Sequence, residues 1–199
     1  MSDNVVDKHE KCHRNPPVFV GPRALHKLGI QYFYVKFLSL FFLQNLCLFQ
    51  IPVENSEKGL ASIAASRCCN YKDEVVITKE TMSDYEDWLK RFFEEHFHPE
   101  DAIRYVVEGS GFFDVRTPED RWIRIVGEPG DLLIIPAGIF HRFTVTKKGY
   151  IKAIRLYKDS PKWVAHNRKD PKTERMEIRK KYLSEINKYI NQEVLTTIY

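Results

Sequence analysis

The sequence predicts a mainly β protein, a sandwich or barrel with a few peripheral helices. Short apolar segments recur between residues 103 and 156, and glycine, proline and aspartate separate them. Regular spacing of short strands and turn residues is typical of all-β sandwiches and barrels. The 199 residues, 43% of them hydrophobic, suffice for one domain spanning residues 1–199, with its core at about residues 70–170.

The first part of the chain contains an atypical apolar segment, residues 37–53. A membrane span needs about 20 predominantly apolar residues, and Gln44, Asn45 and Gln50 interrupt this one. Three interpretations stay open: a transmembrane helix that tethers the chain, a partly buried helix or strand, and an aberrant insertion. A membrane tether is not expected. Residues 1–13 are polar and charged, unlike a secretory signal.

Two helices are predicted outside the strand region. Residues 54–70 are mixed and polar, but apolar residues recur at helical spacing in residues 80–95. Residues 173–190 combine apolar positions with many charges, which indicates an amphipathic C-terminal surface helix. Strands are predicted at residues 103–107, 112–115, 122–125, 132–135, 142–146 and 150–156.

Charge and cysteine content narrow the function classes. The net charge is only +4 and basic residues are interspersed with acidic ones, so no nucleic-acid partner is expected. The four cysteines lack metal-type spacing and include the adjacent Cys68 and Cys69, which fits a reducing, intracellular compartment. No Ser-His-Asp arrangement or phosphate-binding loop is visible.

Three histidines predict a mononuclear metal site. His96 and His98 flank Phe97, and alternate side chains of a strand share one face. His141 follows the turn Pro136-Ala137-Gly138, which places it on a neighbouring strand where it faces the first two. Imidazole suits iron, nickel, zinc and copper. The alternative for His141 is a hydrogen-bonded, partly buried histidine without a metal.

Arg104 and Arg155 stand in strand context around this site. A guanidinium offers a planar fork of donors that matches a carboxylate or an enediolate, so both are candidates for binding an anionic, oxygen-rich substrate. The alternative is an internal salt bridge to Glu94, Glu95 or Glu108. Four aromatic residues are candidates for an apolar pocket: Phe97, Phe112, Phe140 and Trp163.

The pattern His96-x-His98, Gly109, Gly130-x5-Pro136-x-Gly138-x2-His141 resembles the cupin superfamily, a double-stranded β-barrel (jelly roll) of metal-dependent enzymes and binding proteins. With the flanking residues 94–98, 103–105, 109–116, 122–125, 136–144 and 163–168 included, the chain resembles the acireductone dioxygenase family. The resemblance covers residues 70 to about 168 and, more loosely, residues 23–34.

This resemblance implies a monomeric methionine-salvage enzyme of the cytoplasm, and also of the nucleus, with one Fe(2+) or Ni(2+) per monomer. Its substrates are O₂ and the acireductone 1,2-dihydroxy-5-(methylthio)pent-1-en-3-one. The iron form yields formate and 4-methylthio-2-oxobutanoate, and the nickel form yields methylthiopropanoate, formate and carbon monoxide. His96, His98 and His141 match three metal ligands, and Arg104 and Arg155 match substrate-binding arginines.

The fourth ligand that the resemblance implies is a glutamate, and its position here is Ala102, which cannot bind a metal. Glu100 and Asp101 are candidate substitutes, and water or three imidazoles alone are the alternatives. The segment 32–70 also departs from the shorter, charged helical segment of the family. Two hypotheses follow: a dioxygenase of reduced activity, and a catalytically silent cupin that acts as a binding or regulatory protein.

Overall fold

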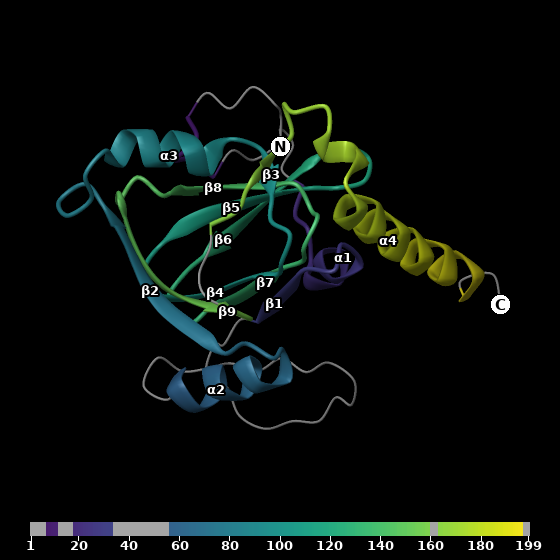
Figure 1. The fold of residues 1–199 in the computed structure, drawn as a ribbon, viewed down its shortest axis with the longest axis horizontal. Coiled ribbons are helices and arrows are strands. Elements are labelled where there is room, and N and C mark those ends of the chain that lie inside the picture. The colour runs from purple at the N-terminus through teal and green to yellow at the C-terminus, as the bar shows by residue number, and fades with distance from the viewer. Residues whose placement is uncertain (1–6, 12–17, 34–55, 160–162, 197–199) are drawn as a thin grey trace.

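The computed structural model describes residues 7–11, 18–33, 56–159 and 163–196, and within these it forms two antiparallel five-stranded sheets that face each other (Figure 1). One sheet has the order β1 (Gln31–Phe33), β7 (Leu132–Ile135), β4 (Ala102–Gly109), β9 (Tyr150–Tyr157) and β2 (Tyr71–Thr78). The other has the order β10 (His166–Asn167), β3 (His96–Phe97), β8 (His141–Val145), β5 (Gly111–Arg116) and β6 (Trp122–Gly127). The predicted mainly β fold is confirmed.

The main core lies between the two sheets. It unites Val115 and Ile125 of one sheet with Leu133 and Ile135 of the other, all of them buried. The register explains which residues point inward: Val115 lies opposite His141, and Phe113 lies opposite Phe143. Residues that face each other across two strands share a face of the sheet, so β8 turns His141 toward the space between the sheets.

Every strand predicted between residues 103 and 156 is present, with ends shifted by at most three residues. The strand β2 was not predicted. Its side chains alternate only weakly between buried and exposed, because Tyr71 to Glu74 remain largely exposed at the sheet edge, and Ile77 and Thr78 are buried next to each other. The turn between β8 and β9 is tight: Gly149 has a φ of +66°, and its N–H donates to the carbonyl of Thr146.

The helices lie around the two sheets (Figure 1). They are α1 (Pro22–Lys27), α2 (Ser56–Ser66), α3 (Tyr85–Phe93), the short 3-10 helix η2 (Thr173–Arg175) and α4 (Glu177–Thr196). The helix expected over residues 80–95 is shorter because Asp84 has a left-handed φ of 54° and Glu94 is extended. The sequence did not predict α2, which packs the buried Leu60 against the outer face of the sheet that contains β4.

The C-terminal helix is confirmed as amphipathic: α4 buries Arg179, Tyr182 and Ile186 and exposes Lys180 and Lys181. The apolar segment 37–53 lies outside the described residues, so its three interpretations are not tested. Among the helices that the structure describes, none combines the length and apolar content that a membrane crossing requires.

Candidate metal centre

The structure brings the three predicted histidines together. β3 and β8 are neighbours, His96 lies opposite His141, and His98 follows directly after β3. The candidate ligand atoms of the three side chains lie within 4.8 Å of one another. The ring centroids are 4.6 to 5.0 Å apart, so the rings converge without stacking.

Backbone carbonyls fix the orientation of each imidazole. Nδ1 of His96 lies 2.6 Å from the carbonyl oxygen of Glu94, Nδ1 of His98 lies 2.6 Å from that of Val164, and Nδ1 of His141 lies 3.0 Å from that of Ile139. A carbonyl oxygen only accepts, so each Nδ1 carries the proton and donates. Each Nε2 therefore keeps its lone pair, as a metal-binding histidine requires.

The same surroundings keep the imidazoles neutral. Burial, and to a smaller extent the neighbouring His96, lower the pKa of His98 to about 3. Burial also lowers the pKa of His96 and holds the pKa of His141 well below its usual range. At neutral pH all three side chains are in the deprotonated form that binds a metal.

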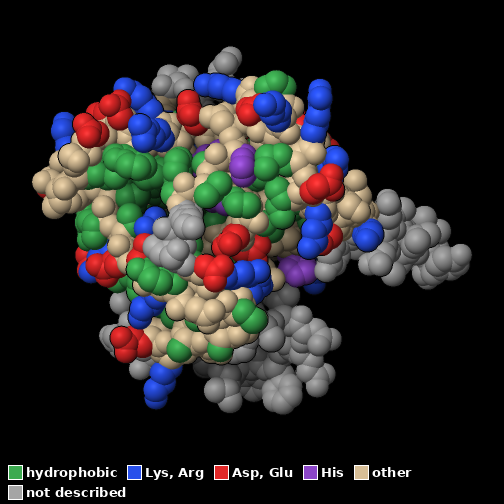
Figure 2. All heavy atoms as spheres, viewed as in Figure 1, with side chains coloured by type: hydrophobic (Ala, Val, Ile, Leu, Met, Phe, Trp, Pro, Cys, Tyr) green, Lys and Arg blue, Asp and Glu red, His purple; other side chains and the backbone are tan. Residues whose placement is uncertain are grey.

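A cavity of about 90 Å³ opens beside the histidines, and its lining is mostly apolar. In Figure 2 a group of purple histidine side chains at the upper centre lies among green hydrophobic ones. Trp163 lines the cavity as expected, but Phe97, Phe112 and Phe140 do not, and Phe97 packs against Phe140 at 5.5 Å between ring centroids. Three other phenylalanines line it instead: Phe92, Phe113 and Phe143.

Ala102 begins β4, is only 5% exposed and lines the same cavity. The two candidate substitutes for a carboxylate ligand lie elsewhere. Asp101 accepts hydrogen bonds from Nη1 of Arg67 at 3.1 Å and from the N–H of Ala137 at 3.0 Å, and Glu100 is exposed. Among the described residues, the group that can hold a metal here consists of the three histidines, and neither Glu100 nor Asp101 joins it.

Arg104 and Arg155 lie opposite each other on β4 and β9, and both line the cavity. Arg155 forms an internal salt bridge, but with a partner that the sequence did not indicate: its Nε and Nη2 donate to the two carboxylate oxygens of Asp73 at 2.9 and 2.6 Å. The expectation of Glu94, Glu95 or Glu108 as that partner is wrong, because Asp73 is the residue that β2 places opposite Arg155.

Arg104 has no such partner. Its Nη1 donates to the carbonyl oxygen of Ile103 at 2.9 Å, and among the described residues no carboxylate lies within salt-bridge distance of it. Burial lowers the pKa of Arg104 to about 10, so the guanidinium remains charged at neutral pH. The cavity therefore contains one arginine that is neutralised and one that is available to an anion.

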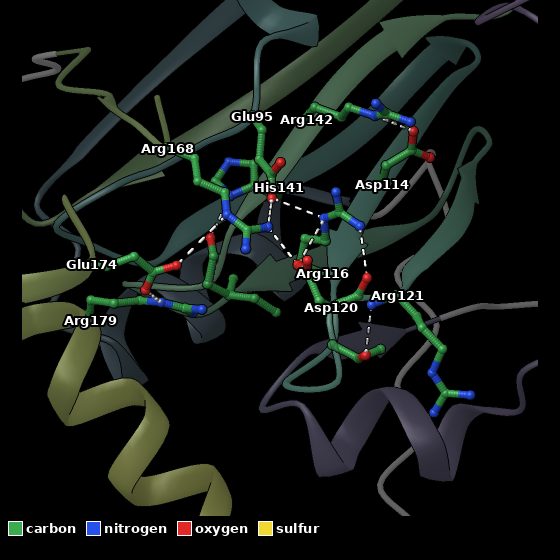
Figure 3. A network of polar contacts seen from close by, with 12 residues as sticks. Glu95, Asp114, Arg116, Asp120, Arg121, His141, Arg142, Arg168, Glu174 and Arg179 are labelled. Carbon is green, nitrogen blue, oxygen red and sulfur yellow. Dashed lines mark hydrogen bonds and ion pairs between the residues drawn. The ribbon is translucent and has the colours of Figure 1, made fainter. Parts of the chain in front are cut away.

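A network of arginines and carboxylates holds the chain segments next to the histidines (Figure 3). Glu95, the residue before His96, accepts from Nε of Arg116 at 3.0 Å and from Nη1 of Arg168 at 2.7 Å. The N–H of Arg168 also donates to the carbonyl of Glu95 at 2.9 Å, and its Nη1 donates to Asp120 at 2.6 Å. Glu95 is thus held by charged hydrogen bonds to its side chain from Arg116 of β5 and from Arg168, which follows β10, and by a backbone hydrogen bond from Arg168.

The C-terminal helix extends this network to the other histidines. Arg179 of α4 is 7% exposed, and it donates to Glu174 at 3.1 Å and to the carbonyl of Gly138 at 3.0 Å. The N–H of Gly138 donates in turn to the carbonyl of His98 at 3.1 Å. A Cβ at Gly138, whose φ is +83°, would lie 2.7 Å from the carbonyl oxygen of Ile178. The helix therefore packs directly on the turn that leads to His141.

Sequence reasoning missed Asp73 and Arg179, and it considered Glu95 as a partner of Arg104 or Arg155, whereas Glu95 pairs with Arg116 and Arg168. No strand was predicted at residues 71–78, where the structure has β2 and its Asp73. An arginine in an amphipathic helix is usually on the solvent side, so the sequence contained no signal that Arg179 is buried.

Comparisons with known proteins agree with this geometry. A profile of the ARD/ARD' family matches residues 1–165. The chain is 49% identical over 144 residues to acireductone dioxygenase 1 of Coprinopsis cinerea, covering 71% of this chain and 80% of that protein. It is 40% identical over 185 residues to acireductone dioxygenase 4 of Arabidopsis thaliana, covering 92% and 89%.

A solved structure shares the arrangement of the sheets. This is the acireductone dioxygenase from Bacillus anthracis with a cadmium ion in its active centre, which is 25% identical to this chain. The TM-score is 0.58, and the match covers 73% of this chain and 87% of that one. With the family profile matching residues 1–165 of 199, the chain belongs to the acireductone dioxygenase family of cupins.

Proposed function

We propose that this chain is an acireductone dioxygenase that cleaves 1,2-dihydroxy-5-(methylthio)pent-1-en-3-one with O₂. The observation that supports it most directly is the convergence of three Nε2 lone pairs beside a cavity that also contains Arg104. With Fe(2+) the expected products are formate and 4-methylthio-2-oxobutanoate. With Ni(2+) they are methylthiopropanoate, formate and carbon monoxide.

The residues fit a divalent metal ion. His96, His98 and His141 are neutral, carry their protons on Nδ1 and present Nε2 to a common point, and imidazole is a good ligand for iron and nickel alike. We propose that these three residues hold one Fe(2+) or Ni(2+) ion. A bound ion of this kind supplies Lewis acidity and open positions for the substrate oxygens and O₂.

The other cavity residues bind and shield the substrate. The guanidinium of Arg104 donates to the oxygens of the enediolate, and its lack of a carboxylate partner in the described chain leaves the fork available. Arg155 contributes less, because Asp73 already neutralises it. Phe92 and Trp163, whose ring centroids lie 6.2 Å apart, cover the apolar side and exclude water from it.

One observation favours a second candidate function. Ala102 lines the cavity at the position where the resemblance implies a glutamate, and no described carboxylate replaces it. Without an anionic ligand the site binds a divalent ion less tightly. A catalytically silent cupin that acts as a binding or regulatory protein would retain the fold and the three histidines without turnover.

The test is to load the metal-free chain with Fe(II) or Ni(II) and to measure bound metal, O₂ consumption and products side by side. We expect one metal per chain and a different product set for each metal. His98→Ala should abolish metal binding and turnover, and the matched control His26→Ala, on the exposed face of α1, should leave both unchanged. Metal binding without any consumption of acireductone or O₂ would favour the silent cupin.

A further inference from the structure

The cavity beside the histidines carries an unbalanced positive charge. Arg155 is neutralised by Asp73, but Arg104 has no carboxylate partner in the described chain. A divalent ion on three neutral imidazoles adds two further positive charges, and the dianionic substrate of the proposed function removes two. One positive charge is then left in a largely apolar cavity, and a buried charge without a partner is costly.

The space for a balancing group lies on one face of β4. Residues 102 and 104 are alternate positions of this strand, so their side chains share a face. Both line the cavity together with His96, His98 and His141. The side chain of Ala102 ends at its methyl group, so it fills little of the space between Arg104 and the histidines that line the same cavity.

We infer that this cavity binds a small monocarboxylate, of the size of formate or acetate, between Arg104 and the metal-binding histidines. Paired N–H donors of a guanidinium match the two oxygens of a carboxylate, and a compact anion such as chloride cannot use both in the same way. The inference rests on the proposed function, which supplies the divalent ion and the dianionic substrate of the charge count and has formate as a product.

Such an anion couples to metal binding. A carboxylate that binds the metal-loaded chain but not the metal-free chain raises the apparent metal affinity by the factor one plus its concentration divided by its dissociation constant. For a dissociation constant of about 10 mM, about 100 mM acetate strengthens Ni(II) binding about 11-fold. Acetate also binds free Ni(II) weakly, which acts against this change, so an observed increase is not an artefact of the buffer.

The experiment measures the Ni(II) affinity of the whole chain by competition with a chromophoric chelator, in acetate, formate or chloride at equal ionic strength. We expect acetate and formate to raise the affinity about tenfold and chloride to have less than a third of that effect. Ala102→Glu supplies the carboxylate from within the chain, so it should bind Ni(II) tightly in chloride and no longer respond to acetate. Ala102→Gln, which has the shape of the Glu variant without its charge, should lose the response to acetate without gaining Ni(II) affinity. Near-UV circular dichroism verifies that both variants fold.

An equal effect of chloride and acetate would overturn the assignment to a carboxylate, and an unchanged affinity in all three salts would overturn the anion site itself. Both outcomes are read from the unaltered chain and need no variant. Turnover is measured separately. If acetate raises the metal affinity but the chain shows no turnover, the anion site is supported and the proposed function is contradicted. If the chain turns over but acetate does not change the metal affinity, the proposed function is supported and the anion site is contradicted.

Discussion

Replacing Arg179 by methionine tests whether the C-terminal helix positions the histidines. The substitution keeps the length and apolar part of the side chain but removes the hydrogen bond to the carbonyl of Gly138 at 3.0 Å and the ion pair with Glu174 at 3.1 Å. A buried hydrogen bond from a charged donor contributes about 1.5–3 kcal/mol. The ion pair contributes about 0.2–1 kcal/mol, because Glu174 is 44% exposed.

The guanidinium also lies 4.4 Å from the ring centroid of Phe140 and 5.6 Å from that of Tyr182, and these cation–π contacts are lost as well. We therefore expect Arg179→Met to lower the free energy of unfolding by at least about 2–4 kcal/mol, measured by urea denaturation with an unchanged m-value. Because Gly138 also donates to the carbonyl of His98, the Ni(II) affinity should fall about tenfold, as for other residues that orient metal ligands. Arg179→Lys keeps the charge but cannot reach both Glu174 and the carbonyl of Gly138, so it should recover part of the lost stability and part of the lost Ni(II) affinity.

Lys180→Met is the matched control on the same helix, because Lys180 is exposed and, among the described residues, forms its ion pair with the exposed Glu177. It should change stability by less than about 0.5 kcal/mol and leave metal affinity unchanged. If Arg179→Met destabilises the chain no more than this control does, the buried contacts of Arg179 do not contribute to stability. If it destabilises the chain but leaves Ni(II) affinity within about twofold, then α4 supports the fold without positioning the histidines.

Two further predictions concern charge. Burial lowers the pKa of His98 from 6.5 to about 3, so between these pH values the unfolded chain binds more protons than the folded chain. As the pH falls from 6.5 to 5.5, His98 alone should therefore lower the free energy of unfolding of the metal-free protein by about 1 kcal/mol, and equal urea midpoints at the two pH values would contradict this. Asp73→Asn removes the partner of Arg155 and should lower the free energy of unfolding by about 1–2 kcal/mol. Arg104→Met should instead reduce kcat/KM at least about tenfold with little change in stability, and the opposite ranking of these two variants would refute the division of roles between the arginines.

The strands that form the histidine site were predictable because their signal is local. Between residues 103 and 156 each predicted strand is a short apolar segment followed by a turn with glycine, proline or aspartate, and the structure contains all of these strands. The edge strand β2 gave no such signal. One of its faces is largely exposed and its first half carries Asp73 and Glu74, so its place in the sheet depends on pairing with β9 and not on its own sequence.

The faces of the strands were harder to predict than their positions. Phe112 was expected to line the pocket and Phe113 does so instead, which is a shift by one residue. Alternation alone cannot tell which of two neighbouring phenylalanines points inward. The register across β8 settles it, because Phe113 lies opposite Phe143, and Phe143 is two residues from His141 on the same face.

The same rule explains why a neighbouring carboxylate does not take the place of a ligand at Ala102. Asp101 is adjacent in sequence, but consecutive residues of extended chain point to opposite sides. The side chain of Asp101 accordingly meets Arg67, which follows α2 on the outer face, and it also fixes the N–H of Ala137. Turning this carboxylate toward the histidines would need a slip of β4 by one residue, which would also turn Arg104 out of the cavity. Since the chain cannot turn Asp101 toward the histidines without losing Arg104 from the cavity, the carboxylate next to Ala102 in sequence cannot act as the missing ligand.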